Sequence, residues 1–153
     1  MFILRAVVPQ DEPFLFQLYA GTRIQEIAQW GWDRRTALGF LRMQWTAQQR
    51  SYAAHYPELE QRIVQVEERP VGRLLLSRAR AADIVVDLSL LPELRGQGIG
   101  TALLQEVLRQ AAVAKKPCRL QVTAGNPARR LYERLGFRTT GADEIYEQME
   151  WRS

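Results

Sequence analysis

The sequence predicts one domain of the α/β or α+β class. Short apolar runs of strand length alternate with longer amphipathic runs whose apolar residues have helical spacing. The chain has 153 residues, enough for one domain with a hydrophobic core. No internal repeat, low-complexity tract or linker interrupts this order. We therefore expect a single domain over residues 1–153.

The N-terminal segment is predicted to form a strand followed by a helix. Residues 2–8 are mostly apolar, which favours a strand. Pro9-Gln10-Asp11 then opens the helix, with Asp11 as its N-cap and Pro13 in its first turn. Apolar residues at helical spacing from Phe14 to Tyr19 give this helix one face for packing.

A second helix and a hairpin are predicted next. Trp30-Gly31-Trp32-Asp33 breaks the first helical pattern, and a new one runs from about Arg34 to Ala54. The apolar runs 63–66 and 71–76 predict a β-hairpin that turns at Glu68-Arg69-Pro70.

The second half of the chain is predicted to alternate strands and helices. The run from Ile84 to Leu91 is nearly continuous in apolar residues, which is typical of a central strand. Asn126 is a favourable helix N-cap, and Pro127 suits the first helical position. In order, we expect a strand at 84–91, a helix at about 98–114, a strand at 119–122, a helix from 127 that stops at Gly136, and two closing strands up to Trp151.

Composition excludes several classes of protein. The chain is 46% hydrophobic and 25% charged, which is typical of a globular domain. Its net charge of +4 comes from scattered residues, with no stripe of basic and aromatic side chains, so we expect no nucleic-acid partner. No apolar span reaches membrane length, and no secretion signal is present, so we expect a cytoplasmic protein. A single cysteine, Cys118, and a single histidine, His55, predict neither an intrachain disulfide nor a metal site.

The segment from Arg95 to Gly100 is the strongest functional signal. Its three glycines lie between a predicted strand and a predicted helix, where residues without Cβ atoms leave main-chain N–H groups accessible. The positive end of the helix adds to these N–H groups, so the segment predicts a site for a phosphate-bearing cofactor. It is neither a P-loop, because no lysine follows, nor a dinucleotide fingerprint, because Thr101 or Leu103 stands where the third glycine belongs.

What remains is the pattern R-x-x-G-x-G, and it resembles the signature of the GNAT superfamily of N-acetyltransferases. Arg95, Gly98 and Gly100 match this signature residue by residue. A second family element resembles N-P-A-R-R-L-Y-E-R-L-G-F, with matches at Asn126, Ala128, Leu131-Tyr132 and Gly136-Phe137. The resemblance implies a mixed, mostly antiparallel central sheet of six to seven strands, flanked by about four helices and splayed between strands 4 and 5.

The resemblance also implies acetyl-CoA as the cofactor. Its pyrophosphate would lie on the N–H groups at the start of the helix, and its pantetheine arm would pair with the main chain of the fourth strand. Asn126 would contact the arm, although a plain helix cap explains this residue equally well. The implied cofactor-binding residues are Leu88, Leu90, Arg95, Gly96, Gln97, Gly98, Ile99, Gly100, Thr101 and Asn126.

The implied catalytic residues are Tyr132 and Asp87. Tyr132 matches the family position of the tyrosine that protonates the departing thiolate, while its alternative role is packing beside Leu131. Asp87 lies within an apolar strand, where an unpaired carboxylate is costly, so we expect it to face the acceptor cleft as general base or to form an ion pair. Asp83 is a second candidate for the base, and Glu58 and Glu60 are weaker ones.

Trp30 and Trp32, beside a glycine in a predicted loop, are expected to bind the acceptor. We therefore expect an N-acetyltransferase that transfers an acetyl group directly to a primary amine in a ternary complex. The acceptor is a small molecule or a peptide, and a homodimer remains open. A non-catalytic acyl-CoA sensor with the same fold is the alternative, and a nucleic-acid-binding module is a third hypothesis, from a different class.

Overall fold

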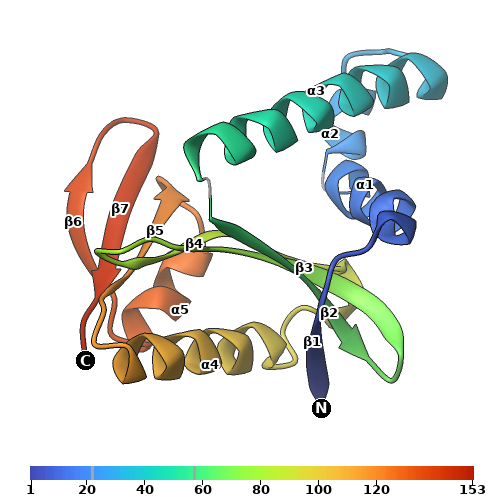
Figure 1. The fold of residues 1–153 in the computed structure, drawn as a ribbon. Coiled ribbons are helices and arrows are strands. Elements are labelled where there is room, and N and C mark those ends of the chain that lie inside the picture. The colour runs from blue at the N-terminus through green and yellow to red at the C-terminus, as the bar shows by residue number, and fades with distance from the viewer. Residues whose placement is uncertain (22, 57) are drawn as a thin grey trace.

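The computed structural model of the chain describes residues 1–21, 23–56 and 58–153 (Figure 1). Helices and strands follow one another in mixed order. The strands are β1 (Phe2–Ala6), β2 (Leu59–Val66), β3 (Arg69–Arg78), β4 (Asp83–Leu90), β5 (Cys118–Thr123), β6 (Arg138–Ala142) and β7 (Tyr146–Trp151). The α-helices are α1 (Glu12–Gly21), α2 (Ile24–Ala28), α3 (Arg34–His55), α4 (Ile99–Val113) and α5 (Ala128–Arg134), and short 3₁₀ turns lie at Pro9–Asp11 and Pro92–Leu94.

The seven strands form one sheet in the order β1-β2-β3-β4-β5-β7-β6. Neighbouring strands are antiparallel except β4 and β5, which are parallel. A parallel pair needs a long crossover connection, and α4 supplies it. The predicted mixed, mostly antiparallel sheet is thereby confirmed.

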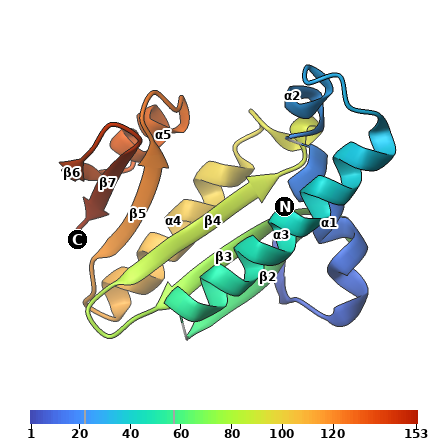
Figure 2. The same ribbon diagram turned by 90° about the horizontal axis from the view of Figure 1, so that it is seen from above.

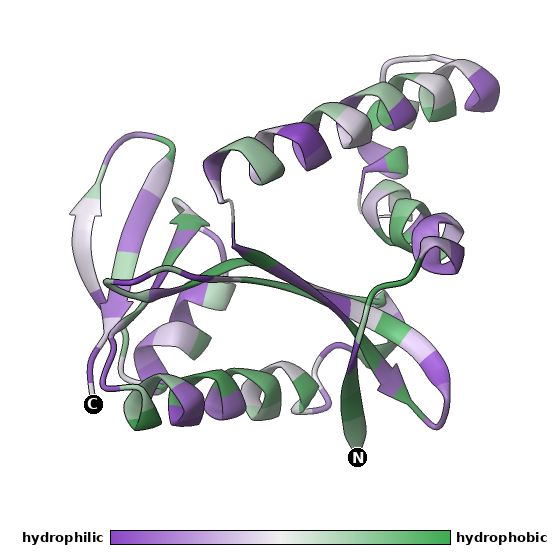
Figure 3. Cartoon of the chain, viewed as in Figure 1, coloured by the Kyte–Doolittle hydropathy of each residue, from purple (hydrophilic) through white to green (hydrophobic). Residues whose placement is uncertain are grey.

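Helices cover the sheet on both faces. Figure 1 shows α4 and α5 below the sheet and α1, α2 and α3 above it, and Figure 2 shows α3 crossing over β2 and β3. Hydrophobic and hydrophilic residues alternate along α4 (Figure 3), as expected of a helix with one face on a sheet. Four buried residues of this face pack with the lower side of β3, β4, β5 and β7, and they are Leu104, Val107, Leu108 and Ala111. A fifth, Leu103, packs in another cluster with Val64 of β2 and Val71 of β3.

A β-bulge in β4 changes the direction of its side chains. Leu76 of β3 pairs with Val85 of β4, and Leu75 of β3 pairs with Asp87 of β4. Val86 therefore has no partner on β3 and is the extra residue of the bulge. Val85 packs in the core cluster with α4, and strict alternation would send Asp87 to that same side. Because of the extra residue, Leu88 faces α4 instead, and Asp87 faces the opposite side of the sheet.

Several local predictions need correction. Asp11 is not a helix N-cap: its carboxylate accepts the Val8 N–H at 2.9 Å and pairs with Arg5 at 2.7 Å. The hairpin turns at Glu67 and Glu68, both with the left-handed φ that a two-residue turn requires, and not at 68–70. The part of the chain that the structure describes also contains the short helix α2, which brings the α-helices to five where about four were expected.

Candidate active site

The sheet opens between β4 and β5. The two strands pair only where Asp83–Val85 lie beside Cys118–Leu120. From the Val86 bulge to Leu90, β4 remains paired with β3 but has left β5. The main-chain groups on this edge are therefore placed to accept an added strand-like partner.

The glycine segment lies at the end of this edge. Gly96 and Gly98 have φ angles of 75° and 83°, in the left-handed region that favours glycine. Gly98 is the N-cap of α4, so the first N–H groups of the helix point out of the segment. A Cβ atom at Gly96, Gly98 or Gly100 would meet no other atom within 4 Å, which shows that the space over this loop is open.

A groove of about 580 Å³ joins the open edge of β4 to the glycine segment. Of the predicted site residues, it is lined by Leu88, Leu90, Arg95, Gly96, Gly98, Gly100, Thr101 and Tyr132. The structure thus brings together eight residues from β4, the glycine segment, α4 and α5. The groove is also lined by Arg134, which the sequence analysis missed although it lies within the matched N-P-A-R-R-L-Y-E-R-L-G-F element.

Three predicted cofactor residues do not line this groove. The side-chain amide of Gln97 donates to the Glu93 carbonyl at 2.8 Å. Ile99 packs into a core cluster. The Asn126 side chain accepts the Ala128 N–H at 2.9 Å. The helix α5 begins at Ala128 with Pro127 in the N-cap position, so Asn126, the predicted cap, lies one residue before that position.

Tyr132 reaches the groove from α5. Its ring packs against Phe137 with 5.9 Å between ring centroids. Burial, and after it the charge of Asp87, raise the pKa of the Tyr132 phenol above its ordinary value. The phenol therefore keeps its proton at neutral pH and remains a hydrogen-bond donor.

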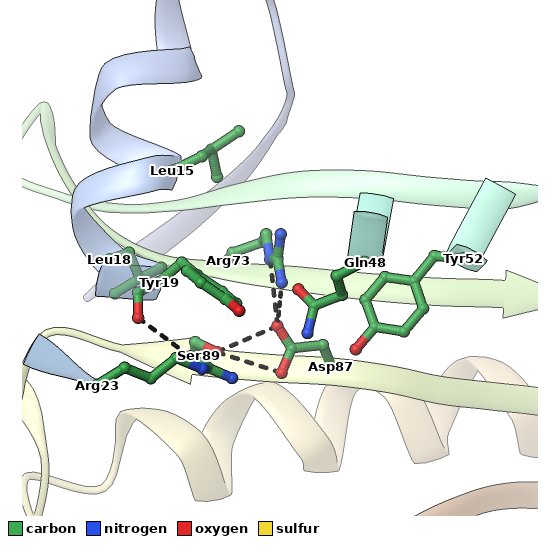
Figure 4. A pocket seen from close by; sticks show the side chains of 9 residues that line it. All are labelled: Leu15, Leu18, Tyr19, Arg23, Gln48, Tyr52, Arg73, Asp87 and Ser89. Carbon is green, nitrogen blue, oxygen red and sulfur yellow. Dashed lines mark hydrogen bonds and ion pairs between the residues drawn. The ribbon is translucent and has the colours of Figure 1, made fainter. Parts of the chain in front are cut away.

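Asp87 lies on the other face of β4, in a cavity of about 100 Å³ (Figure 4). The cavity lies between β3, β4, α1 and α3, and its polar lining residues are Tyr19, Arg23, Gln48, Tyr52, Arg73 and Ser89 together with Asp87. Asp87 was expected to face the acceptor cleft or to form an ion pair at the sheet surface; it lines this cavity and forms an ion pair with Arg73, which is buried.

Arg73 of β3 holds one oxygen of Asp87. Arg73 is only 4% exposed, and its Nε and Nη2 donate to Oδ2 of Asp87 at 3.1 and 2.5 Å, while its Nη1 donates to Gln49 at 3.2 Å. The Ser89 hydroxyl lies 3.2 Å from Oδ1 and 3.1 Å from Oδ2. Both Arg73 bonds fall on Oδ2, so Oδ1 keeps most of its capacity to accept a proton or a hydrogen bond.

The other candidates for the general base lie elsewhere. Asp83 is 1% exposed at the start of β4, where it pairs with Arg78 at 2.8 Å and Lys116 at 2.7 Å. It links β3 and β4 to the segment that follows α4, and it lines neither the groove nor the cavity at Asp87. Glu60 pairs with Arg62 and Arg78, and Glu58 is exposed.

The two predicted acceptor tryptophans lie away from Asp87. Trp30 and Trp32 pack edge to face with each other and with Phe40, and they are 54% and 40% exposed. Neither lines the Asp87 cavity. Tyr52 of α3 lines that cavity instead. Its helical spacing is the same for a core position and for a cavity wall, so the sequence carried no signal to separate them.

A further cavity of about 420 Å³ lies on the same face of the sheet. It extends between the end of α3, the start of β4 and strands β5 to β7, and Tyr52 lines it as well as the Asp87 cavity. Its polar and aromatic lining includes Tyr56, Tyr146, Arg119, Gln121 and Gln148.

Among residues 1–21, 23–56 and 58–153, no three His, Cys, Asp or Glu side chains are grouped so that they could bind a metal ion. Within the same ranges, no helix combines the length and hydropathy required of a membrane span.

Comparison with known proteins gives a consistent result. Residues 59–139 match the family model described as acetyltransferase (GNAT) domain. The structure is similar to the PaiA N-acetyltransferase of Thermoplasma acidophilum in complex with coenzyme A, with a TM-score of 0.74, 16% identity and coverage of 100% of this chain and 99% of that one. No curated protein sequence matches the chain.

Two other solved structures show the same fold. The ribosomal-protein-S18-alanine N-acetyltransferase of Escherichia coli has a TM-score of 0.67 at 15% identity, covering 99% of this chain and 94% of that one. A GNAT family acetyltransferase of Elizabethkingia anophelis with acetyl-CoA bound has a TM-score of 0.58 at 15% identity, covering 67% of this chain and 82% of that one.

Proposed function

The chain belongs to the GNAT family of acetyltransferases, and from that premise we propose that it transfers the acetyl group of acetyl-CoA directly to a primary amine. One observation carries the proposal: a long groove and a carboxylate-bearing cavity lie on opposite faces of β4, next to the edge that β5 leaves unpaired. A donor in the groove and an acceptor in the cavity would meet at this edge. We also propose that residues 1–153 act as one domain.

The groove fits coenzyme A in size and in chemistry. The open space over Gly96, Gly98 and Gly100 lets a pyrophosphate approach the N–H groups at the start of α4. Arg95 and Arg134 add positive charge along the groove. The edge of β4 near Leu88 and Leu90 can pair with the amide groups of the pantetheine arm.

When bound, acetyl-CoA supplies a thioester, and the chain supplies the groups that act around it. An N–H of the unpaired β4 edge can donate to the thioester oxygen and stabilise the negative charge that develops there. Asp87 Oδ1 can accept a proton from the acceptor's ammonium group, directly or through one water, and the neutral amine that results can attack the thioester carbon. Tyr132, which keeps its proton at neutral pH, can donate it to the departing sulfur.

A thiol-release assay tests the proposal. The protein is mixed with acetyl-CoA and a panel of primary amines, including amino acids, peptides and polyamines, and the free thiol is measured. We expect release that depends on at least one amine. Coenzyme A binding without turnover on any member of the panel would instead support a non-catalytic sensor.

Asp87→Asn tests the role of the carboxylate in the same assay. A general base contributes about 10²- to 10⁴-fold to a rate, so we expect a loss of kcat/KM in that range with unchanged affinity for coenzyme A. The matched control is Asp33→Asn, because Asp33 caps α3 through the Thr36 N–H and asparagine caps helices as well as aspartate does. Equal activity of the two variants would remove Asp87 from the mechanism.

A further inference from the structure

The Asp87 cavity is too small for a large acceptor. An apolar cavity of about 150 Å³ is what a benzene ring occupies. The Asp87 cavity, at about 100 Å³, therefore holds an amine and a few adjoining carbon atoms but no ring. Tyr52 forms one of its walls and also lines the cavity of about 420 Å³, so the larger cavity is placed to receive the rest of the acceptor.

The Asp87 cavity offers two hydrogen-bond acceptors to an amine. Figure 4 shows the side chains of Gln48 and Tyr52 reaching from α3 toward Asp87. Within the three described stretches of the chain, Gln48 Oε1 is buried without a hydrogen-bond partner, and Asp87 Oδ1 is contacted by the Ser89 hydroxyl at 3.2 Å. A buried acceptor without a donor costs free energy. An ammonium group, with its three N–H donors, would serve both oxygens.

The larger cavity has an aromatic wall. Tyr52 of α3 and Tyr56, which follows the helix, have 6.5 Å between their ring centroids, and Tyr146 lines the cavity from β7. Ile84 and Val86 of β4 add apolar surface. A ring that packs against other rings is stabilised beyond the burial of its apolar area. This lining therefore favours an aromatic group.

The other polar side chains of the larger cavity already have partners. Arg119 Nε donates to Glu150 at 2.7 Å. Gln148 Nε2 donates to Gln121 Oε1 at 3.3 Å, and the Thr140 hydroxyl donates to the Gln148 carbonyl at 3.4 Å. Because these groups are satisfied by one another and by Glu150, the lining does not require a charged substituent on the ligand.

The two cavities together provide a carboxylate for one ammonium group. Among the described residues, Asp87 is the only carboxylate that lines either cavity. A second ammonium group of a polyamine would lie among the tyrosines and Arg119, with no carboxylate in the lining to balance its charge. Aromatic faces alone attract cations by a small amount, so spermidine is the acceptor that competes with this interpretation.

We propose that the acceptor is a primary amine with one positive charge and an aromatic group, that is, an arylalkylamine; this inference rests on the proposed acetyl transfer. The ammonium group binds Asp87 Oδ1 and Gln48 Oε1. A short aliphatic linker passes Tyr52, and the aromatic ring lies in the larger cavity beside Tyr56 and Tyr146.

Transfer to such an amine is balanced without a further reactant. The C–N bond forms on the carbonyl carbon of the thioester as its C–S bond breaks. The ammonium group loses two protons: Asp87 accepts the first and passes it to solvent, and the second replaces the proton that Tyr132 gives to the departing sulfur. The products are the N-acetylated amine, coenzyme A as its free thiol, and one proton.

Matched acceptors test the proposal directly. Acetyl transfer from acetyl-CoA is compared for phenethylamine, 2-cyclohexylethylamine, ethylamine and spermidine. Burial of a phenyl ring corresponds to about a ten- to hundredfold effect, so we expect kcat/KM for phenethylamine to exceed that for ethylamine and for spermidine by such a factor. It should exceed that for the saturated ring severalfold, because contacts between aromatic rings are lost there. Equal or better turnover of any of the other three amines would overturn the arylalkylamine proposal and leave the acetyltransferase proposal standing.

Substitution of Tyr146 tests the aromatic wall. In Tyr146→Ala, the ratio of kcat/KM for phenethylamine to that for ethylamine should fall about tenfold, because ethylamine does not extend into the larger cavity. The matched control is Ile145→Ala, a neighbouring side chain that is 62% exposed and lines neither cavity, and it should keep the ratio of the unaltered protein. An unchanged ratio in Tyr146→Ala would overturn the role given to the larger cavity.

Substitution of Gln48 tests the site for the amine. Gln48→Leu keeps a side chain of similar size and removes the unpaired acceptor. We expect KM for phenethylamine to rise about tenfold or more, with an unchanged affinity for coenzyme A and no loss of stability. The matched control is Gln44→Leu, an exposed glutamine one turn earlier on α3, which should keep the KM of the unaltered protein. A loss of stability with unchanged KM would show that Gln48 is only structural.

A binding measurement keeps the proposal testable if no amine is turned over. N-acetylphenethylamine and N-ethylacetamide are titrated by calorimetry into the protein saturated with coenzyme A. We expect the aromatic amide to bind about tenfold more tightly, or better, than its counterpart without the ring. Equal binding would contradict the arylalkylamine proposal, whereas preferential binding without turnover would contradict only the proposed catalysis.

Discussion

Arg73 donates two hydrogen bonds to the same oxygen of Asp87, Oδ2, so the two carboxylate oxygens have different surroundings. Oδ2 anchors the side chain to β3. Oδ1 remains exposed to the cavity, where it contacts the Ser89 hydroxyl. A base must be held in place without losing all its lone pairs, and this arrangement satisfies both requirements.

Tyr132→Phe tests the proposed general acid. The substitution keeps the ring that packs on Phe137 and removes only the hydroxyl. We expect kcat to fall by about 10²-fold or more, the usual range for general acid catalysis, with an unchanged dissociation constant for coenzyme A. Steady-state kinetics and calorimetry separate the two quantities. Full activity in the variant would show that Tyr132 only packs.

The pH dependence has a defined sign. Burial and the charge of Asp87 raise the pKa of Tyr132, so the protonated, donating form persists beyond the pH of about 10 at which a free phenol titrates. If Tyr132 is the acid, the alkaline fall of kcat lies above that pH and is absent from Tyr132→Phe. A pH profile of kcat for both proteins checks this, and a fall near neutral pH would assign the acid to another group.

At the scale of elements, the start of α4 is the part most directly encoded in the sequence. The spacing of Arg95, Gly98 and Gly100 is local, so it predicts the loop and the helix start without knowledge of the rest of the fold. Tyr132 and its helix were recognisable for the same reason. The groove lined by these residues agrees with that local pattern.

The cavity on the opposite face could be predicted only in part. Asp87 was identified because a carboxylate in an apolar strand needs a partner. The face of the sheet to which its side chain points depends on the bulge at Val86, and no residue type in the sequence predicts that bulge. Arg73 and Gln48 are distant in sequence, and strand register and helix docking bring them to Asp87. Trp30 stood out by its residue type, yet it packs with Phe40 outside this cavity.

Two glycine substitutions at α4 separate backbone strain from cofactor access. Gly98→Ala introduces a side chain at a φ of 83°, so we expect a loss of about 1–2 kcal/mol in the free energy of unfolding as well as weaker coenzyme A binding. Gly100→Ala has no such strain and no steric contact within 4 Å. It should preserve stability or slightly increase it, since alanine favours helices.

Calorimetry with coenzyme A distinguishes the two effects. We expect both variants to bind more weakly, because a methyl group over the helix start blocks the approach of a pyrophosphate. Denaturant unfolding measures the strain separately. Undiminished binding by Gly100→Ala would mean that the pyrophosphate does not lie over this residue.

At the scale of the whole molecule, Cys118 can report how the fold opens. It is buried on β5, and burial, followed by the charge of Asp83, raises the pKa of its thiol to about 12. Since the thiolate is the reactive form, a thiol reagent at pH 8 should label the native protein only when it opens.

Coenzyme A should slow this labelling. A ligand present at 100 times its dissociation constant stabilises the native state by about 2.7 kcal/mol, which corresponds to about a hundredfold lower labelling rate when opening requires release of the ligand. The rate is followed by mass spectrometry with and without coenzyme A, using pantothenate as a control that lacks the diphosphate. An unchanged rate would mean that coenzyme A does not bind or that Cys118 is reached without release of the ligand.

The opening between β4 and β5 has a consequence for how such a protein can change over time. In the function that we propose, acetyl-CoA would be met chiefly by main-chain groups of a strand and a helix start, and the acceptor by side chains on the other face of the sheet. Replacing Arg23 or Gln48 would alter the second without touching the first. Substitutions in the lining of the Asp87 cavity could therefore change the acceptor, while the groove proposed for acetyl-CoA stays the same.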